Sequence, residues 1–415
     1  MTKAASTFTP ELRSDLLPAQ AHARRTATGD QPSQWSGVFA MALCVFALIA
    51  SEFMPVSLLT PIATDLHVSE GMAGQAIAVS GAFALLTSLA VPALARRMDR
   101  KSILLGMTAC MAISGALIAL AQGFAWYMLG RVFIGVSVGG FWSLSAATAI
   151  RLVPAPKVPR ALAIFNGGNA LATVIAAPLG SLIGALVGWR GAFLGLVPLA
   201  ALAFAWQWVG LPSMPGNEPA PGSRNPLRLL ANPLVLLGMA AVSLFFMGQF
   251  VLFTYVRPFL EQTANFHGSA LSMVLLAIGV AGFIGTTLIG WFLCRDLYRT
   301  LIAIPLAMAA VAVALVALGE LAACAIGLLV VWGLLATAAP VGWWSWLAKT
   351  LPESAEAGGG LMVAVVQLAI GLGSSVGGLL FDACGYVTTF GFSAGLLLAA
   401  AFFATATARR SRRAA

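Results

Sequence analysis

A series of long apolar runs constrains this chain more than any other feature. Twelve segments of about 20 mostly apolar residues follow one another along its 415 residues, and a helix needs about that length to cross a bilayer. In lipid, helices satisfy all their backbone hydrogen bonds internally. The runs therefore predict an all-α membrane protein with twelve transmembrane helices. Their approximate bounds are 37–62, 71–95, 102–121, 124–150, 160–187, 190–210, 233–257, 269–293, 300–318, 321–348, 357–381 and 386–407.

Composition excludes several other classes of protein. Hydrophobic residues make up 60% of the chain and charged residues 9%, whereas an ordinary soluble domain carries about 25% charged residues. The three His and five Cys are scattered, with no CxxC pair, so the sequence indicates neither a zinc site nor a disulfide framework. It also lacks a GxxxxGK[ST] phosphate loop, which argues against ATP-driven pumping.

Basic residues predict the orientation of the spans. Of the 23 Lys and Arg residues, 20 fall on one side of the twelve-span arrangement, in alternate loops and both tails. The positive-inside rule assigns that side to the cytoplasm, so we expect both termini there. The net charge of +9 then reflects topology, and we expect no nucleic-acid partner. Residues 1–34 are polar and the first run is too long for a signal peptide, so we expect that run to be retained.

The chain divides near its middle. Loops between runs are short except for residues 211–232, which are rich in Pro, Gly and Asn, a composition that ends helices and forms connectors. The predicted organisation is a cytoplasmic tail at 1–34, an N-terminal six-helix bundle at 35–210, a connector at 211–232, a C-terminal six-helix bundle at 233–408 and a basic tail at 409–415.

An internal repeat relates the two bundles at an offset of 197 residues. Glycines, aromatic residues and acids meet residues of the same or a similar kind at this offset. The pairs are Gly188 with Gly385, Trp189 with Tyr386, Phe193 with Phe390, Asp99 with Asp296, and Glu52 with Gln249. Six helices plus six in the same orientation make two parallel halves, related by an axis along the membrane normal. Such an arrangement predicts a substrate site at the midplane, between the halves.

Several motifs resemble those of the major facilitator superfamily, across residues 36–408. PALARRMDRKSIL (92–104) resembles the loop pattern G-x-L-A-D-R-x-G-R-R-x-x-L, with departures at Pro92, Arg96 and Asp99. LGRVFIGVSVGG (129–140) is similar to the fourth-span R-x-x-x-G motif through Arg131 and Gly135. AAPLGSLIGALVGWRGAF (176–193) is similar to the antiporter motif of the fifth span, although Ala176 and Ala177 replace its Gly-Pro.

A finer resemblance concerns the drug:proton antiporter branch, whose first span resembles EFMPVSLLTPIATDL (52–66). Within that branch the chain resembles bacterial purine ribonucleoside efflux pumps, through residues 52–61, 139–154, 157–165 and 248–258. This resemblance implies proton-coupled antiport of inosine- or guanosine-like nucleosides out of the cell, across the bacterial inner membrane. We expect no cofactor besides the proton gradient, a monomer in contact with membrane lipid, and no enzyme activity.

Other functions stay open at this point. The same fold could export sugars or small lipophilic drugs. A passive channel or a membrane enzyme belongs to a different class. A channel would equilibrate its substrate regardless of the proton gradient, and an enzyme would need a second interior acid or nucleophile beside Glu52.

Two ionisable residues lie inside the predicted spans, namely the acid Glu52 and the base Arg131. Such a group costs about 2.5–3.5 kcal/mol on insertion scales, so a function is the default expectation. The resemblance implies that Glu52 carries the coupled proton and that Arg131 takes part in the coupling. Structural roles stay open for both: Glu52 as a fixed partner of Arg131 or a serine, and Arg131 in a static ion pair or bound to carbonyls.

Substrate contacts are expected from amides and aromatic residues in the spans. An amide offers both a donor and an acceptor to a purine edge or a ribose hydroxyl, and an aromatic face can stack on a base. The candidates are Trp142, Asn166, Asn169, Phe245, Gln249, Phe253, Trp332 and Gln367. Each single amide could instead join two helices.

The loop at 96–101 is predicted to act as a conformational latch through Arg97, Asp99 and Arg100. We expect Asp99 to accept hydrogen bonds from an adjacent helix end, or to pair with Arg96 or Arg160. The alternative is a solvated loop whose charges serve topology alone.

Overall fold

In the computed structural model, the described part of the chain covers residues 34–95, 97–215, 226–352 and 355–414. Nearly all of it is helical, and these residues contain no strand. Most of the predicted tail at 1–34 and the middle of the predicted connector lie outside it.

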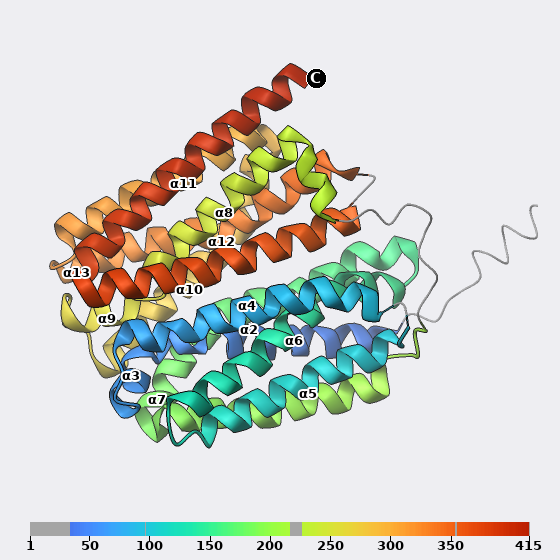
Figure 1. Cartoon of the computed structure of the whole chain (residues 1–415), viewed down its shortest axis with the longest axis horizontal. Coiled ribbons are helices and arrows are strands. Elements are labelled where there is room, and N and C mark those ends of the chain that lie inside the picture. Colours follow the sequence, from blue (N-terminus) through green and yellow to red (C-terminus); the bar gives the residue numbers. More distant parts are fainter. Residues whose placement is uncertain (1–33, 96, 216–225, 353–354, 415) are drawn as a thin grey trace, which may run out of the picture.

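Two helical bundles make up the molecule, and they lie one beside the other (Figure 1). The N-terminal half holds α2 (Trp35–Ser57), α3 (Leu59–Asp65), α4 (Glu70–Leu94), α5 (Arg100–Ala119), α6 (Phe124–Arg151), η2 (Ala155–Lys157) and α7 (Val158–Gly210). The C-terminal half holds η3 (Pro226–Ala231), α8 (Pro233–Phe253), α9 (Val256–Gln262), α10 (Gly268–Arg295), α11 (Leu297–Leu318), α12 (Ala322–Thr350) and α13 (Ala355–Ala414).

Ten helices in the described residues are long and apolar enough to cross a membrane. Two of them, α7 with 53 residues and α13 with 60, would measure about 80 and 90 Å if straight. Each is interrupted by a glycine with non-helical, positive φ: Gly188 at 81° and Gly385 at 71°. Figure 1 shows α13 folding back on itself. Because α7 and α13 each supply two spans, the structure has the twelve predicted spans, and the predicted all-α fold is confirmed.

The repeat seen in the sequence has a structural counterpart at these turns. Trp189 packs edge-on against Phe193 with ring centroids 6.4 Å apart, and Tyr386 packs edge-on against Phe390 at 5.8 Å. The paired acids also match, because Asp99 caps the N-terminus of α5 and Asp296 caps that of α11. Residues paired by the repeat therefore have the same structural roles in the two halves, as packed rings at the turns and as helix caps.

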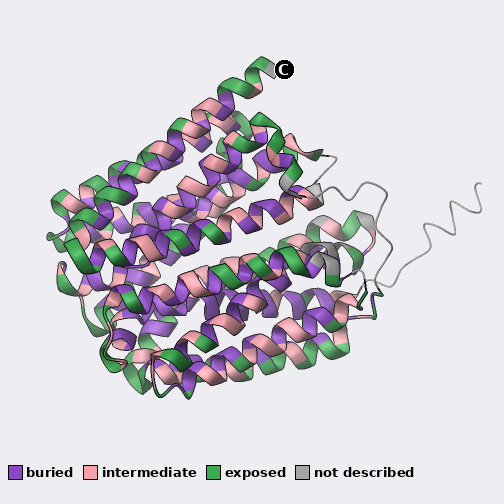
Figure 2. Ribbon diagram, viewed as in Figure 1, coloured by how far each residue is buried: buried purple, intermediate pink, exposed green. Residues whose placement is uncertain are grey.

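Each half has a core of its own. The largest cluster of buried apolar residues comes almost entirely from the C-terminal half, and a second comes from α2 and α4–α7, together with Leu211. Buried residues lie mainly on the inward sides of the helices, and many exposed residues lie on the outward sides (Figure 2). Large apolar side chains are prominent among the exposed ones, including Leu186, Leu379 and Phe402. An outward apolar surface of this kind suits a protein surrounded by lipid.

The two ends of the bundle differ in how the halves meet. We call the end that carries α3 and α9 the distal end, and the end where α6, α10 and α13 terminate the connector end (Figure 1). Hydrogen bonds between the halves run from α4 to α13 and from α7 to α10, through residues in the distal parts of these helices. The described halves are therefore joined by hydrogen bonds toward the distal end.

Candidate functional site

Glu52 lies in the last third of α2, at the contact between the halves. Its side chain is buried, with 5% of the residue exposed. Oε1 accepts a hydrogen bond of 3.2 Å from Nε2 of Gln367, which lies on α13 in the other half. A carboxyl group in this position can change charge and, with it, the strength of a bond between the halves.

Arg131 is fully buried on α6 and is held by backbone carbonyls. Its guanidinium donates to the carbonyl oxygens of Ala76 at 3.1 Å, Ser51 at 3.0 Å and Glu52 at 3.0 Å. It also donates to Oγ of Ser80 at 2.9 Å. Of the alternatives that the sequence leaves open, the arrangement seen is therefore the carbonyl-bound arginine, which ties α6 to α2 and α4.

Pro55 explains why one of these carbonyls is free to accept a hydrogen bond from Arg131. Proline has no backbone N–H, so it cannot donate to the carbonyl four residues earlier in a helix. In α2 that carbonyl belongs to Ser51, and Nη1 of Arg131 takes the place of the missing donor. Because a buried carbonyl without a partner is costly, Pro55 and Arg131 form a complementary pair.

Phe53 and Phe250 stack across the contact between the halves. Phe53 follows Glu52 on α2, and its ring centroid lies 5.6 Å from that of Phe250 on α8, with 29° between the planes. Phe250 also packs edge-on against Phe253 at 6.1 Å. Phe53 and Phe250 are 197 residues apart, so the repeat relates them to each other. Neither is among the site residues predicted from the sequence, although the offset is a signal that points to both.

Gln249 lies next to Phe250 and has an unsatisfied acceptor. It is 8% exposed, and its Oε1 is buried with no hydrogen-bond partner among the described residues. A buried amide oxygen of this kind is available to a donor on a bound molecule. We call Glu52, Phe53, Gln249, Phe250, Phe253 and Gln367 the central site.

The remaining predicted substrate residues lie elsewhere. Phe245 and Trp332 are fully buried in the core of the C-terminal half. Trp142 is half-buried and packs edge-on against Phe165 at 5.9 Å. Asn166 is exposed and donates to the carbonyl of Leu162 in its own helix.

Asn169 is half-buried on α7, four residues before Thr173. The structure thus brings Gln367 into contact with Glu52 and Phe253 into contact with Phe250. Gln249 is the neighbour of Phe250 along the chain, and no contact with these residues is seen for Asn169 among the described residues.

The predicted latch binds the start of the connector. Asp99 accepts from the backbone N–H of Lys101 at 2.8 Å and of Met214 at 2.9 Å, and from the hydroxyl of Ser213. The N–H of Arg100 in turn donates to the carbonyl of Met214 at 3.0 Å. Arg97 is exposed. These bonds join the N-terminus of α5 to the connector that follows α7. Of the two arrangements that the sequence leaves open for Asp99, the structure shows acceptance of hydrogen bonds, from its own helix and from the connector, and no ion pair with Arg160 among the described residues.

Burial alone would raise the pKa of Asp99, but the hydrogen bonds from Ser213, Met214 and Lys101 outweigh it and hold the pKa below the ordinary value. A carboxyl with a lowered pKa stabilises the fold when ionised. Its contribution is therefore complete at neutral pH and is lost only in acid, below the ordinary aspartate range.

A second set of polar contacts closes the distal end, and we call it the distal clasp. Asp382 on α13 accepts from Oγ of Ser69 at 2.5 Å and from the N–H of Gly71 at 2.9 Å, at the N-terminus of α4. Gln262 donates to Glu70 at 3.0 Å, and Arg257 donates to the carbonyl of Ser57. Asp382 is not among the predicted site residues, and it lies one residue beyond the predicted span at 357–381.

Two parallel helical halves, with a buried carboxyl and stacked aromatic rings where they meet, define a polytopic membrane transporter. The chain belongs to the Major Facilitator Superfamily, whose family model matches residues 41–374. The resemblance seen in the sequence is therefore confirmed.

Individual relatives cover nearly the whole chain. The transcription regulatory protein OpdE of Pseudomonas aeruginosa is 62% identical over 383 residues, which are 92% of this chain and 95% of that protein. The purine ribonucleoside efflux pump NepI of Shigella sonnei is 41% identical over 372 residues, 90% of this chain and 94% of that protein. A bacterial homolog of the human lysosomal transporter Spinster, in an inward-facing and unoccupied conformation, has the same fold. It has a TM-score of 0.73 at 16% identity and covers 92% of this chain and 96% of that one.

Proposed function

We propose that this chain exports purine ribonucleosides of the inosine or guanosine kind in exchange for protons. The proposal rests first on relatives named purine ribonucleoside efflux pumps, at about 40% identity over nearly the whole chain. The observation that carries the mechanism is the buried Glu52, hydrogen-bonded to Gln367 across the two halves.

The central site has suitable chemistry for a nucleoside. Phe53, Phe250 and Phe253 offer faces on which a base can stack. Gln249 has an acceptor without a partner among the described residues, which suits a donor on a purine edge or a ribose hydroxyl. A ligand entering here would separate Phe53 from Phe250 and so act on the contact between the halves.

The position of Glu52 supports proton coupling. Its ionised carboxylate is a stronger acceptor for Gln367 than the neutral acid is, so proton uptake weakens one bond between the halves. Arg131 acts by holding the backbone at Ser51 and Glu52. In this mechanism it is a positioning residue, and the proton itself is carried by Glu52.

The proposal also includes the orientation of the chain in the membrane and the membrane in which it lies. The basic residues at the connector end favour a cytoplasmic position for that end and both termini, in the inner membrane of a bacterium. The halves are joined toward the distal end, which suits a conformation open to the cytoplasm. We propose a monomer as the working unit, since each chain supplies both halves of the site.

The test is uptake into everted membrane vesicles with an acidic lumen. We expect radiolabelled inosine or guanosine to accumulate, and collapse of the pH gradient with an uncoupler to abolish the accumulation. Excess unlabelled purine nucleoside should compete, whereas sugars and lipophilic cations should not. Competition by sugars or drugs alone would assign the chain to another substrate class, and uptake that ignores the gradient would indicate a passive channel.

A second candidate comes from the name of the Pseudomonas relative, which refers to transcription. A membrane sensor would bind a ligand at the central site and signal without moving it. Proteoliposomes containing only the purified chain separate the two functions. A transporter accumulates nucleoside there, whereas a sensor binds it without accumulation.

A further inference from the structure

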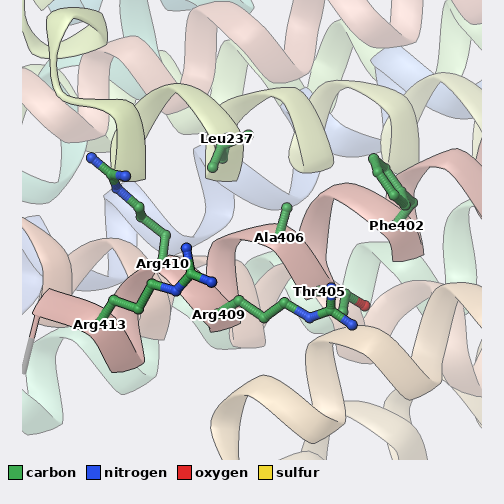
Figure 3. Close-up of a pocket in the computed structure, with 7 residues that line it drawn as sticks. All are labelled: Leu237, Phe402, Thr405, Ala406, Arg409, Arg410 and Arg413. Carbon is green, nitrogen blue, oxygen red and sulfur yellow. The ribbon is translucent and has the colours of Figure 1, made fainter.

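A pocket lies near the connector end, between α8 and the last turns of α13 (Figure 3). Its volume is about 360 Å³. The lining residues are Leu237, Phe402, Thr405, Ala406, Arg409, Arg410 and Arg413, and we call it the arginine pocket. It is separate from the central site and uses no residue of it.

The pocket combines a basic end with an apolar wall. On α13, Phe402, Ala406, Arg409 and Arg413 follow one another at intervals of three or four residues, so they lie along one face of the helix. Phe402 is 69% exposed, and a ring exposed on the outward side of a membrane helix meets acyl chains. The helix continues to Ala414, which holds the arginines on ordered turns rather than in a loose tail.

Among the described residues, no acid balances the charge of the pocket. Arg409, Arg410 and Arg413 are close in sequence on one helix, and like charges at this spacing repel. In the described part of the chain none of the three forms an ion pair. The partial negative charge at the C-terminus of a helix offsets some of this repulsion. An anion in the pocket would offset it more fully.

The repeat shows that these arginines are not required by the fold. At the offset of 197 residues, Arg409 and Arg410 correspond to Pro212 and Ser213 in the N-terminal half, and Phe402 corresponds to Ala205. Both halves form a six-helix bundle, yet the equivalent positions of the N-terminal half carry neither these arginines nor the aromatic ring.

We propose that the arginine pocket binds the phosphate headgroup of an anionic phospholipid, with an acyl chain lying along Phe402 and Leu237. Basic pockets at membrane-helix ends bind anionic headgroups, and guanidinium groups recognise phosphate oxygens with paired hydrogen bonds. The apolar wall favours a lipid over a soluble phosphate, since only a lipid would also cover Phe402. A lipid there would link α8 of the C-terminal half to its last helix.

Native mass spectrometry of the purified full chain tests this proposal. The chain is released from detergent micelles in the presence of phosphatidylglycerol or of phosphatidylcholine with the same acyl chains. We expect preferential retention of phosphatidylglycerol. The double variant Arg409→Gln/Arg413→Gln should weaken its binding by about fivefold for each arginine removed. The matched control Arg412→Gln/Lys349→Gln removes two exposed charges at the same end, outside the pocket, and should bind like the unmodified chain.

Three results would overturn the proposal. Equal retention of the two lipids would show that the headgroup charge is not recognised. Equal weakening in the control variant would reduce the effect to general surface charge. Displacement of the lipid by glycerol 3-phosphate, which has no acyl chain, would make the pocket a site for soluble anions. Thermal unfolding curves that superimpose for all variants exclude a difference in folding as the cause.

Discussion

Pro55 and Arg131 together determine the geometry around the buried carboxyl. The proline leaves the carbonyl of Ser51 without a helical donor, and the arginine supplies one at 3.0 Å. A lysine would keep the charge but lose the planar fork that serves several carbonyls at once. The role of Arg131 therefore depends on hydrogen-bond geometry more than on charge.

This role predicts coupling between the two residues. Arg131→Lys should destabilise the chain by about 2 kcal/mol, because buried carbonyls lose their donor. In a Pro55→Ala background, residue 55 can donate to Ser51 again, so the same arginine substitution should cost about 1 kcal/mol less. Denaturant unfolding in detergent measures the four free energies of the cycle. Additive effects would show that Arg131 does not substitute for the donor that Pro55 lacks.

At the scale of single residues, a site residue can be predicted from the sequence when its side-chain type is unusual for its surroundings. It cannot be predicted when the contact is made by backbone atoms or depends on packing. Glu52 and Arg131 stand out because charges are rare in apolar runs. The partners of Arg131 are mostly backbone carbonyls, which every residue has, so no residue type in the sequence marks them. Phe245 and Trp332 have the right chemistry for a substrate site, but only packing reveals that they are buried in a core.

Two glycines carry the turns that let α7 and α13 each supply two spans. At Gly188 φ and ψ are 81° and 163°, and at Gly385 they are 71° and −173°, a region that is essentially restricted to glycine. An added Cβ would meet no atom within 4 Å at either position. Any effect of a side chain there must therefore come from the backbone conformation.

Gly188→Ala and Gly385→Ala should each destabilise the chain by about 1–3 kcal/mol. The matched controls are Gly195→Ala and Gly391→Ala, at helical positions with equally open space. Alanine is favoured over glycine inside a helix, so the controls should be stabilising by about 0.5–1 kcal/mol. Thermal unfolding in detergent distinguishes the pairs, and equal effects at turn and helix positions would refute the conformational argument.

The helices are the feature of this molecule that the sequence predicts best. The apolar runs predict the number of spans, and the offset of 197 residues pairs Gly188 with Gly385, the two glycines at the turns. The described boundaries differ by a few residues, because helices such as α10 and α12 continue past their apolar segments. The distal clasp could not be predicted, because it depends on how two distant helices meet rather than on a pattern within either.

In the whole molecule, the distal clasp and the central site together hold the halves in one arrangement. Asp382 binds the N-terminus of α4 in the other half through Ser69 and Gly71. A carboxylate at a helix N-terminus is stabilised by the partial positive charge of that terminus. Asp382→Asn should therefore favour separation of the halves at the distal end, by about 1 kcal/mol or roughly fivefold in the equilibrium.

Spin labels on α3 and α9 report this separation as a distance distribution. The control is Asp65→Asn, because Asp65 lies at the same end but pairs with Arg190 inside the N-terminal half at 2.5 Å. We expect a larger long-distance population for the Asp382 variant and an unchanged distribution for the control. The same shift in both variants would mean that loss of any distal charge, rather than the clasp, causes it.

The central claim is that the gain and loss of a proton at Glu52 drives accumulation of substrate. The direct measurement is nucleoside uptake into everted vesicles by the Glu52→Gln variant, with Glu320→Gln, an exposed acid, as the control. We predict that Glu52→Gln abolishes accumulation driven by the pH gradient while nucleoside exchange persists, and that Glu320→Gln behaves like the unmodified chain. A Glu52→Gln variant that still concentrates nucleoside at the full rate would contradict the account.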